Sequence, residues 1–231
     1  MSDPVLTQPW WRTPAVGVSE PPSVVRRRRI TVSVVLVVGA VLLSLSLTRS
    51  PGDASFYWLT LAMAAVWIGG GIVSGPLQLG TVRYAGQERS PALAGTAVGL
   101  IVAAAFVAGA LVAREIPGVR EYITDVLVFA NQGALPLVVF ITVINGLAEE
   151  VFFRGALYTA LGTFYPAIVS TVIYIFTTLA SGNPMLGFAA VLLGAVCAYE
   201  RWVTGGVLAP MLTHFWWGLA MVLVLPPLFG V

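Results

Sequence analysis

The sequence has no lysine, a single cysteine and a single histidine, and only 10% of its 231 residues are charged. A soluble domain carries about 25% charged residues, so this composition excludes an ordinary soluble fold. The lone Cys197 excludes an intrachain disulfide and, within a hydrophobic segment, is expected to be a small core residue. Nucleic-acid binding needs a solvated basic face with aromatic platforms. The chain supplies no such face, and we expect no nucleic-acid partner.

What the sequence has in excess is apolar residues, because 58% of them are hydrophobic and the mean hydropathy is +0.91. The length accommodates about seven spans of ~20 residues plus loops. The sequence therefore predicts an all-α, polytopic transmembrane helical bundle with a disordered N-terminal tail. Gly95 and Gly99 form a small-xxx-small pair that favours close packing of another helix. The expected spans are 30–47, 56–74, 92–113, 134–161, 165–180, 185–199 and 207–225, with a short interfacial helix at 122–130.

The charged residues outside the spans predict the topology. Arg26 to Arg29 precede the first span, and a basic cluster at this place favours the cytoplasmic side. We expect residues 1–29 to be a disordered cytoplasmic tail, 30–113 to form three N-terminal spans and 114–231 to form the functional core. A cleaved signal peptide is disfavoured because the polar tail is long and no small-residue cleavage site follows the first span. The expected location is the plasma membrane, with the lipid bilayer as a partner.

Three ionisable side chains lie together inside the fourth expected span. They are Glu149, Glu150 and Arg154, and each costs at least about 2.5–3.5 kcal/mol near the bilayer centre. On an α-helix Glu150 and Arg154 are i,i+4 neighbours, which predicts a structural ion pair. Glu149 is rotated by about 100° from Glu150 and has no cation on its own helix. We therefore interpret Glu149 as the candidate general base.

The only histidine lies at a similar depth in the membrane. Glu149 lies about 13 residues before the membrane face at the end of the fourth span, and His214 lies about nine residues beyond the membrane face near Gly205, which gives depths of roughly 20 and 13 Å. Contact between them is feasible in a tilted bundle. Because buried histidine in a membrane is costly and marks function, Glu149 and His214 form the candidate catalytic pair.

These residues resemble a known family, the CAAX-processing and bacteriocin-processing endopeptidases (the CPBP or ABI family of intramembrane proteases). The resemblance covers about residues 135–225. It implies a helical bundle with a polar cavity in the membrane, in which Glu149 activates water to attack a peptide bond. It also implies that histidines and an asparagine hold water, a metal ion or the developing oxyanion. The motifs that carry it are Glu149-Glu150-x-x-x-Arg154-Gly155, Tyr199-Glu200-Arg201-Trp202-Val203-Thr204-Gly205-Gly206 and Ala209-Pro210-Met211-Leu212-Thr213-His214.

The chain departs from the family pattern at two places. The second motif, Phe-x-x-x-His, is expected at Phe176, where the histidine position is Ala180. The third motif, His-x-x-x-Asn or His-x-x-x-Asp, ends here at Gly218. Asn145 and Asn183 are candidate replacements that hold water or the oxyanion, although Asn183 also fits a tight turn before Pro184.

A zinc site is the less favoured of two cofactor alternatives. Catalytic zinc normally has three protein ligands. The chain offers Glu149 and His214 as zinc ligands, whereas Glu150 is better explained as the ion-pair partner of Arg154. The expected cofactor is therefore none, with zinc on Glu149 and His214 as the alternative.

The expected function is an intramembrane endopeptidase, metalloendopeptidase-like in its family, that hydrolyses a peptide bond of a membrane-associated or lipid-modified protein. One alternative is a catalytically inactive relative that acts as a membrane scaffold or immunity protein. Another is a proton-coupled transporter, since buried glutamate and histidine also form proton relays, although we find no internal repeat of the kind such transporters show. Phe215, Trp216 and Trp217 are expected either to line a lipophilic groove or to pack within the bundle.

Overall fold

The computed structural model describes residues 21–231, and the predicted tail up to residue 20 lies outside the described residues. The described chain is largely helical, with one small antiparallel hairpin between the second and third helices. The elements are α1 (Pro22–Leu47), α2 (Ala54–Ser74), β1 (Val82–Tyr84), β2 (Gln87–Arg89), α3 (Ala92–Ala113), α4 (Val119–Asn131), α5 (Leu135–Glu149), the π-helix η2 (Glu150–Leu157), α6 (Tyr158–Leu161), α7 (Pro166–Leu179), α8 (Pro184–Thr204) and α9 (Leu208–Phe229).

Within the described residues, six helices are long and apolar enough to cross a membrane, counting Leu135–Leu161 as one run through α5, η2 and α6. Lipid favours such helices because every backbone polar group must be satisfied within the protein. The predicted all-α membrane bundle is confirmed, and the chain is a multi-pass membrane protein. The fifth expected span is the shorter apolar helix α7. Its 14 residues extend about 21 Å, less than the ~30 Å hydrocarbon core.

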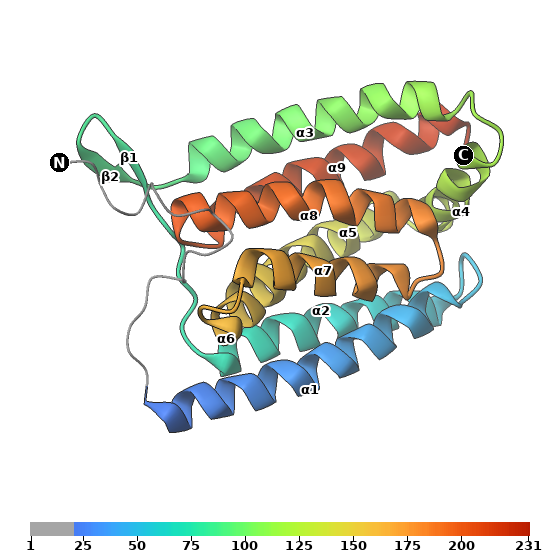
Figure 1. The fold of residues 1–231 in the computed structure, drawn as a ribbon. Coiled ribbons are helices and arrows are strands. Elements are labelled where there is room, and N and C mark those ends of the chain that lie inside the picture. The colour runs from blue at the N-terminus through green and yellow to red at the C-terminus, as the bar shows by residue number, and fades with distance from the viewer. Residues whose placement is uncertain (1–20) are drawn as a thin grey trace.

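The long helices lie roughly alongside one another (Figure 1). Helix α3 packs along α9 on one side of the bundle, and α1 packs along α2 on the other. The run through α5 and η2 lies between these pairs, in contact with both α2 and α9. Helix α4 lies at the end of the bundle near the C-terminus, and the hairpin β1–β2 lies at the opposite end. The central position of α5 and η2 surrounds their charged residues with protein.

The close packing of α3 on α9 depends on two glycines, as predicted. A Cβ at Gly95 would lie 2.6 Å from the carbonyl oxygen of Ala209, and one at Gly99 would lie 2.8 Å from the Cα of Thr213. Any larger residue would separate the helices. The Thr213 hydroxyl also lies 3.0 Å from the Gly95 carbonyl oxygen, which ties α3 to the residue before His214.

Three segments illustrate where the structure differs from the prediction. The predicted tail over 1–29 is wrong at its end, because α1 begins at Pro22 and includes Arg26 to Arg29. The segment between the expected second and third spans contains the hairpin β1–β2, which was not predicted. The sixth span continues from the expected end at Tyr199 to Thr204. In the first and third cases, charged residues ended the hydropathy pattern while the helix itself continued.

Two arginines of the basic cluster bind the ends of other helices. The Arg28 Nε donates to the Ser74 carbonyl oxygen at 3.1 Å, at the last residue of α2. The Arg29 Nε donates to the Ala160 carbonyl oxygen at 3.2 Å, near the end of α6. Cations are stabilising at helix C-termini, where carbonyl groups lack intrahelical donors. This cluster therefore joins α1 to two neighbouring helices.

Candidate active site

The two glutamates lie on either side of a change in helix type. Helix α5 ends at Glu149, and the π-helix η2 begins at Glu150. The sequence predicted a continuous α-helix here, and no residue of the run signals the change. π-Helical turns are rare and occur often at functional sites. Glu150 is fully buried, whereas 19% of the Glu149 side chain is exposed, so the two adjacent carboxylates occupy different environments.

Glu150 and Arg154 form a buried ion pair. Arg154 Nη1 lies 3.1 Å from Glu150 Oε1, and both side chains are 0% exposed. The Arg154 Nη2 also donates to the Gly194 carbonyl oxygen of α8 at 3.0 Å. Burying a charge is costly unless a partner and further hydrogen bonds compensate for lost water. Arg154 thus has the partner that the i,i+4 spacing predicted, and it also joins η2 to α8.

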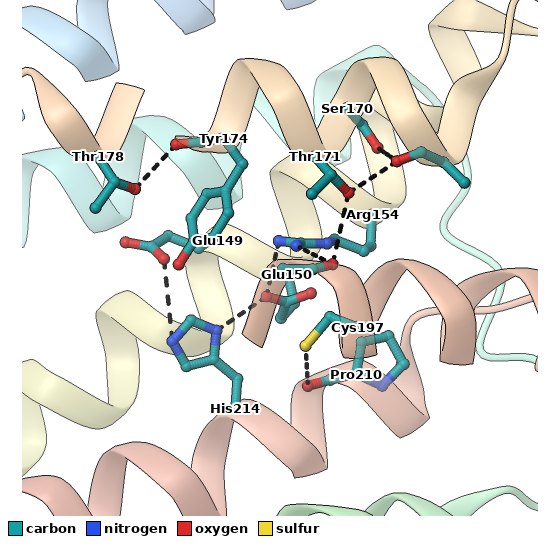
Figure 2. Close-up of polar contacts among 12 residues, drawn as sticks. Glu149, Glu150, Arg154, Ser170, Thr171, Tyr174, Thr178, Cys197, Pro210 and His214 are labelled. Carbon is teal, nitrogen blue, oxygen red and sulfur yellow. Dashed lines mark hydrogen bonds and ion pairs between the residues drawn. The ribbon is translucent and has the colours of Figure 1, made fainter. Parts of the chain in front are cut away.

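His214 of α9 lies between the two glutamates (Figure 2). Its Nδ1 is 2.9 Å from Glu150 Oε1, and its Nε2 is 4.0 Å from Glu149 Oε2. The hydrogen bond to Glu150 was not predicted. Because Glu150 is paired with Arg154 as a carboxylate and can only accept, the His214 Nδ1 carries the hydrogen. In the neutral ring, Nε2 is then an acceptor that faces Glu149.

The approach of His214 to α5 requires a glycine. A Cβ at Gly146 would lie 2.8 Å from His214 Cδ2 and 3.2 Å from its Nε2. Any side chain here would push the imidazole away from the carboxylates. Gly146 is therefore part of the site's geometry, although it carries no chemistry.

Tyr174 of α7 completes the cluster and was missed from the sequence. Its side chain is 5% exposed, and its hydroxyl lies beside the Glu149 carboxylate (Figure 2). The Arg154 guanidinium carbon is 4.6 Å from the centre of the Tyr174 ring, a cation–π distance. The ring also packs against Phe153, with centroids 5.0 Å apart. Tyr174 therefore lies next to Glu149 and also contacts Arg154 of the ion pair.

The position of Tyr174 corrects the predicted register of α7. Ala180 is exposed at the end of the helix, and the Phe176 side chain is 69% exposed, so neither lies in the site. The aromatic residue that faces the glutamates is Tyr174, and Thr178 lies one turn further along the same side. The Thr178 hydroxyl donates to the Tyr174 carbonyl oxygen at 2.9 Å. The site-facing pattern is therefore Tyr-x-x-x-Thr, two residues before the predicted one.

The two candidate asparagines have different surroundings. Asn183 begins α8, where its Oδ1 accepts from the Met185 amide at 2.9 Å and its Nδ2 donates to the Tyr122 carbonyl oxygen at 2.8 Å. It is a helix cap and lies apart from the glutamates. Asn145 lies one turn before Glu149, and its Nδ2 donates to the Ile141 carbonyl oxygen. Its buried Oδ1 has no hydrogen-bond partner among residues 21–231. An oxyanion needs donors, so Asn145 fits the role of a water partner better.

A second pair of buried charges supports the site from α8. Glu200 and Arg201 come directly after the expected end of the sixth span at residue 199, but they are buried, at 7% and 2% exposure. The Arg201 Nε donates to the Arg154 backbone carbonyl oxygen at 2.8 Å. The Glu200 Oε1 lies 2.9 Å from the Thr213 hydroxyl. These residues connect α8 to η2 and to the neighbour of His214. Cys197, one turn earlier, is fully buried as expected.

The donor set does not fit a catalytic zinc ion. The described residues contain no group of three or more His, Cys, Asp and Glu side chains that could hold a metal. Glu150 is committed to Arg154 and to His214 Nδ1, which leaves Glu149 and His214 Nε2. Two ligands are fewer than the three that catalytic zinc normally has.

A large apolar cavity ends next to the site. It has a volume of about 790 Å³ and is bounded by α2, α3, α4, α5, α8 and α9. Trp217, Thr142 and Gly218 line it, one helical turn from His214 and Asn145. The rings of Trp217 and His214 are 5.6 Å apart. We call this space the apolar cavity. It brings an apolar volume into contact with the polar cluster.

Comparison with known proteins finds a matching family model. Residues 131–220 match the family model described as type II CAAX prenyl endopeptidase, Rce1-like. No curated protein and no solved structure matches the chain. The matched segment contains both glutamates, Arg154, Tyr174 and His214. As the motifs indicated, residues 131–220 of this chain are similar to the Rce1-like type II CAAX prenyl endopeptidases.

Proposed function

We propose that the protein is an intramembrane endopeptidase that hydrolyses a peptide bond with a water molecule activated by Glu149. The observation that carries this proposal is the 4.0 Å separation of Glu149 Oε2 and His214 Nε2. Two acceptors that share one water molecule lie about 4–4.5 Å apart when each hydrogen bond is about 2.8 Å. Both groups are acceptors, so together they bind both hydrogens of one water and direct its oxygen lone pair away from themselves.

In the proposed reaction, the water oxygen attacks the peptide carbonyl carbon while Glu149 takes one proton. The tetrahedral intermediate then collapses, the C–N bond breaks, and Glu149 returns the proton to the leaving amine. Glu150 holds the Nδ1–H of His214 and thereby fixes the ring so that Nε2 faces the water. No step requires a metal ion, in keeping with the two-ligand donor set.

The substrate that fits this site has a long apolar part. The apolar cavity has a volume of about 790 Å³, which is in the range of cavities that hold drug-sized ligands. Because Trp217 contacts both the cavity and His214, a chain in the cavity lies next to the activated water. We propose a membrane-associated or lipid-modified protein as substrate, in agreement with the prenyl endopeptidases of the matched family. Phe106, 5.4 Å from the Trp217 ring, extends this wall.

The arrangement in the cell is also part of the proposal. The basic cluster at Arg26 to Arg29 lies at the start of α1, and the positive-inside rule places such a cluster in the cytoplasm. We propose a plasma-membrane protein with a cytoplasmic N-terminus, acting without a cofactor.

The test is cleavage of a farnesylated CAAX peptide by the purified protein in lipid vesicles, with products identified by mass spectrometry. Glu149→Gln keeps the shape of the side chain and removes its basicity, and it is expected to lower kcat at least about 100-fold. Glu115→Gln, at an exposed residue, is the matched control and is expected to retain wild-type activity. Wild-type turnover by Glu149→Gln would refute Glu149 as the base. No cleavage by the wild-type protein would refute the hydrolytic function and favour the non-catalytic scaffold.

A further inference from the structure

Glu149 differs from Glu150 in how its carboxylate is held. Glu150 Oε1 receives two strong contacts, from Arg154 at 3.1 Å and from His214 at 2.9 Å. The nearest His214 nitrogen to Glu149 is 4.0 Å away, which is too long for a direct hydrogen bond. A general base must nevertheless be fixed in direction, because misplacement by about 1 Å can cost 100-fold in rate. Another group must therefore orient Glu149.

The geometry points to Tyr174 as the positioning residue for Glu149. We propose that the Tyr174 hydroxyl donates a hydrogen bond to the Glu149 carboxylate and holds it toward the water that His214 Nε2 shares. This inference rests on the proposed function. Figure 2 shows the phenol reaching down from α7 to the carboxylate. A phenol is a donor to a carboxylate, and a hydrogen bond to an ionised group is roughly twice as strong as a neutral one.

The ring of Tyr174 is itself fixed on two sides. It packs on the Arg154 guanidinium at 4.6 Å and on Phe153 at 5.0 Å. Arg154 is in turn held by Glu150 and by the Gly194 carbonyl oxygen. These contacts fix the position of the hydroxyl. The Glu150–Arg154 ion pair therefore positions Glu149 indirectly, through the Tyr174 ring. A tyrosine on α7 supplies the polar contact that Ala180, exposed at the helix end, cannot supply.

The chain contains a matched control tyrosine. Tyr158 is also buried, at 1% exposure, and the Arg201 guanidinium carbon likewise lies 4.6 Å from its ring centre. Its ring is thus stacked on an arginine like that of Tyr174, but it lies away from Glu149. Phenylalanine at either position keeps the ring and removes one hydroxyl.

The experiment compares Tyr174→Phe with Tyr158→Phe in the vesicle assay, with thermal unfolding measured for both. We expect Tyr174→Phe to lower kcat about 10- to 100-fold, the equivalent of one hydrogen bond to a charged group, with KM within about twofold. Tyr158→Phe is expected to keep kcat within about twofold. Wild-type kcat in Tyr174→Phe overturns the inference, as does an equal fall in both variants that tracks a lower melting temperature.

The Glu149→Gln result separates the two proposals. If Glu149→Gln is inactive and Tyr174→Phe has wild-type kcat, the hydrolytic function stands and only the role of Tyr174 is refuted. If Glu149→Gln is fully active, Glu149 is not the base, and the positioning role of Tyr174 falls with it. If the wild-type protein cleaves no substrate, the hydrolytic function itself is refuted.

Discussion

Replacing Arg154 with methionine would remove the cation that neutralises a fully buried carboxylate. Glu150 would keep its hydrogen bond from His214 at 2.9 Å but would have no charge partner on its own helix. Removing one member of a buried ion pair typically costs about 3–5 kcal/mol. The reverse change, Glu150→Gln, leaves Arg154 without its counterion and is expected to cost a similar amount.

The other contacts of Arg154 place its substitution at the upper end of that range. It also loses the hydrogen bond to the Gly194 carbonyl oxygen, and bonds to charged groups contribute about 1.5–3 kcal/mol. The stack on Tyr174 adds up to about 2 kcal/mol when desolvated. Glu150→Gln retains both of these contacts. We therefore expect Arg154→Met to be the more destabilising of the two variants.

A double-mutant cycle measures the coupling free energy between Glu150 and Arg154. The free energy of unfolding of each variant is obtained in detergent micelles by denaturant or thermal unfolding. The double variant Glu150→Gln/Arg154→Met is expected to lose less than the sum of the single losses by about 2–3 kcal/mol, because neither charge is then left alone. The exposed pair Arg114–Glu115, at 2.9 Å, is the control and is expected to couple by about 0–1 kcal/mol. Coupling no larger than the control's would refute the buried ion pair as a stabilising unit.

Three further predictions concern the geometry of the site. Thr178→His is expected to raise kcat in the vesicle assay, because residue 178 faces the glutamates. Ala180→His, at the exposed helix end, is expected to leave kcat unchanged. The opposite pattern would show that residue 180 is the motif position, as the sequence predicted. Gly146→Ala is expected to lower kcat at least about 10-fold by displacing the imidazole, whereas Gly69→Ala, where a Cβ meets no atom within 4 Å, should not change it; equal activities would show that the close approach is dispensable. Incubation with a strong zinc chelator is expected to leave the rate unchanged, since the site offers two ligands; loss of activity that added zinc restores would contradict this.

Much of the fold follows from the sequence because lipid restricts the choice of backbone structure. Apolar runs of about 20 residues become helices in a membrane, so the spans could be located from hydropathy alone. The errors fall where charge ends the apolar pattern but the helix continues, at Arg26 to Arg29 and at Glu200 and Arg201. In a membrane bundle such residues can lie on the buried side, where carbonyl oxygens and carboxylates replace water as partners.

The site was predictable where it depends on spacing along one helix. The i,i+4 separation brings Glu150 to Arg154 whatever surrounds them. The contacts of His214 depend on the rotation of α9 about its axis. That rotation is set by packing, through Thr213 against Gly95 and Glu200. Depth along the helix placed His214 level with the glutamates, but depth could not decide which carboxylate it would bond.

The side of α7 that faces the site could have been predicted from the positions of its polar residues. Val172, Phe176 and Leu179 are all exposed on this helix, so in the membrane large apolar side chains also face outward, and an aromatic ring by itself does not mark the inside. In a water-soluble helix the same pattern would indicate the reverse. The polar residues are the informative ones here, because an uncompensated hydroxyl is costly in lipid. They recur at helical spacing along one side of α7, at Ser170, Thr171, Tyr174, Thr177 and Thr178. For an intramembrane site, the face of a helix that turns inward is therefore better predicted from the period of its few hydroxyl groups than from a family motif aligned on an aromatic residue.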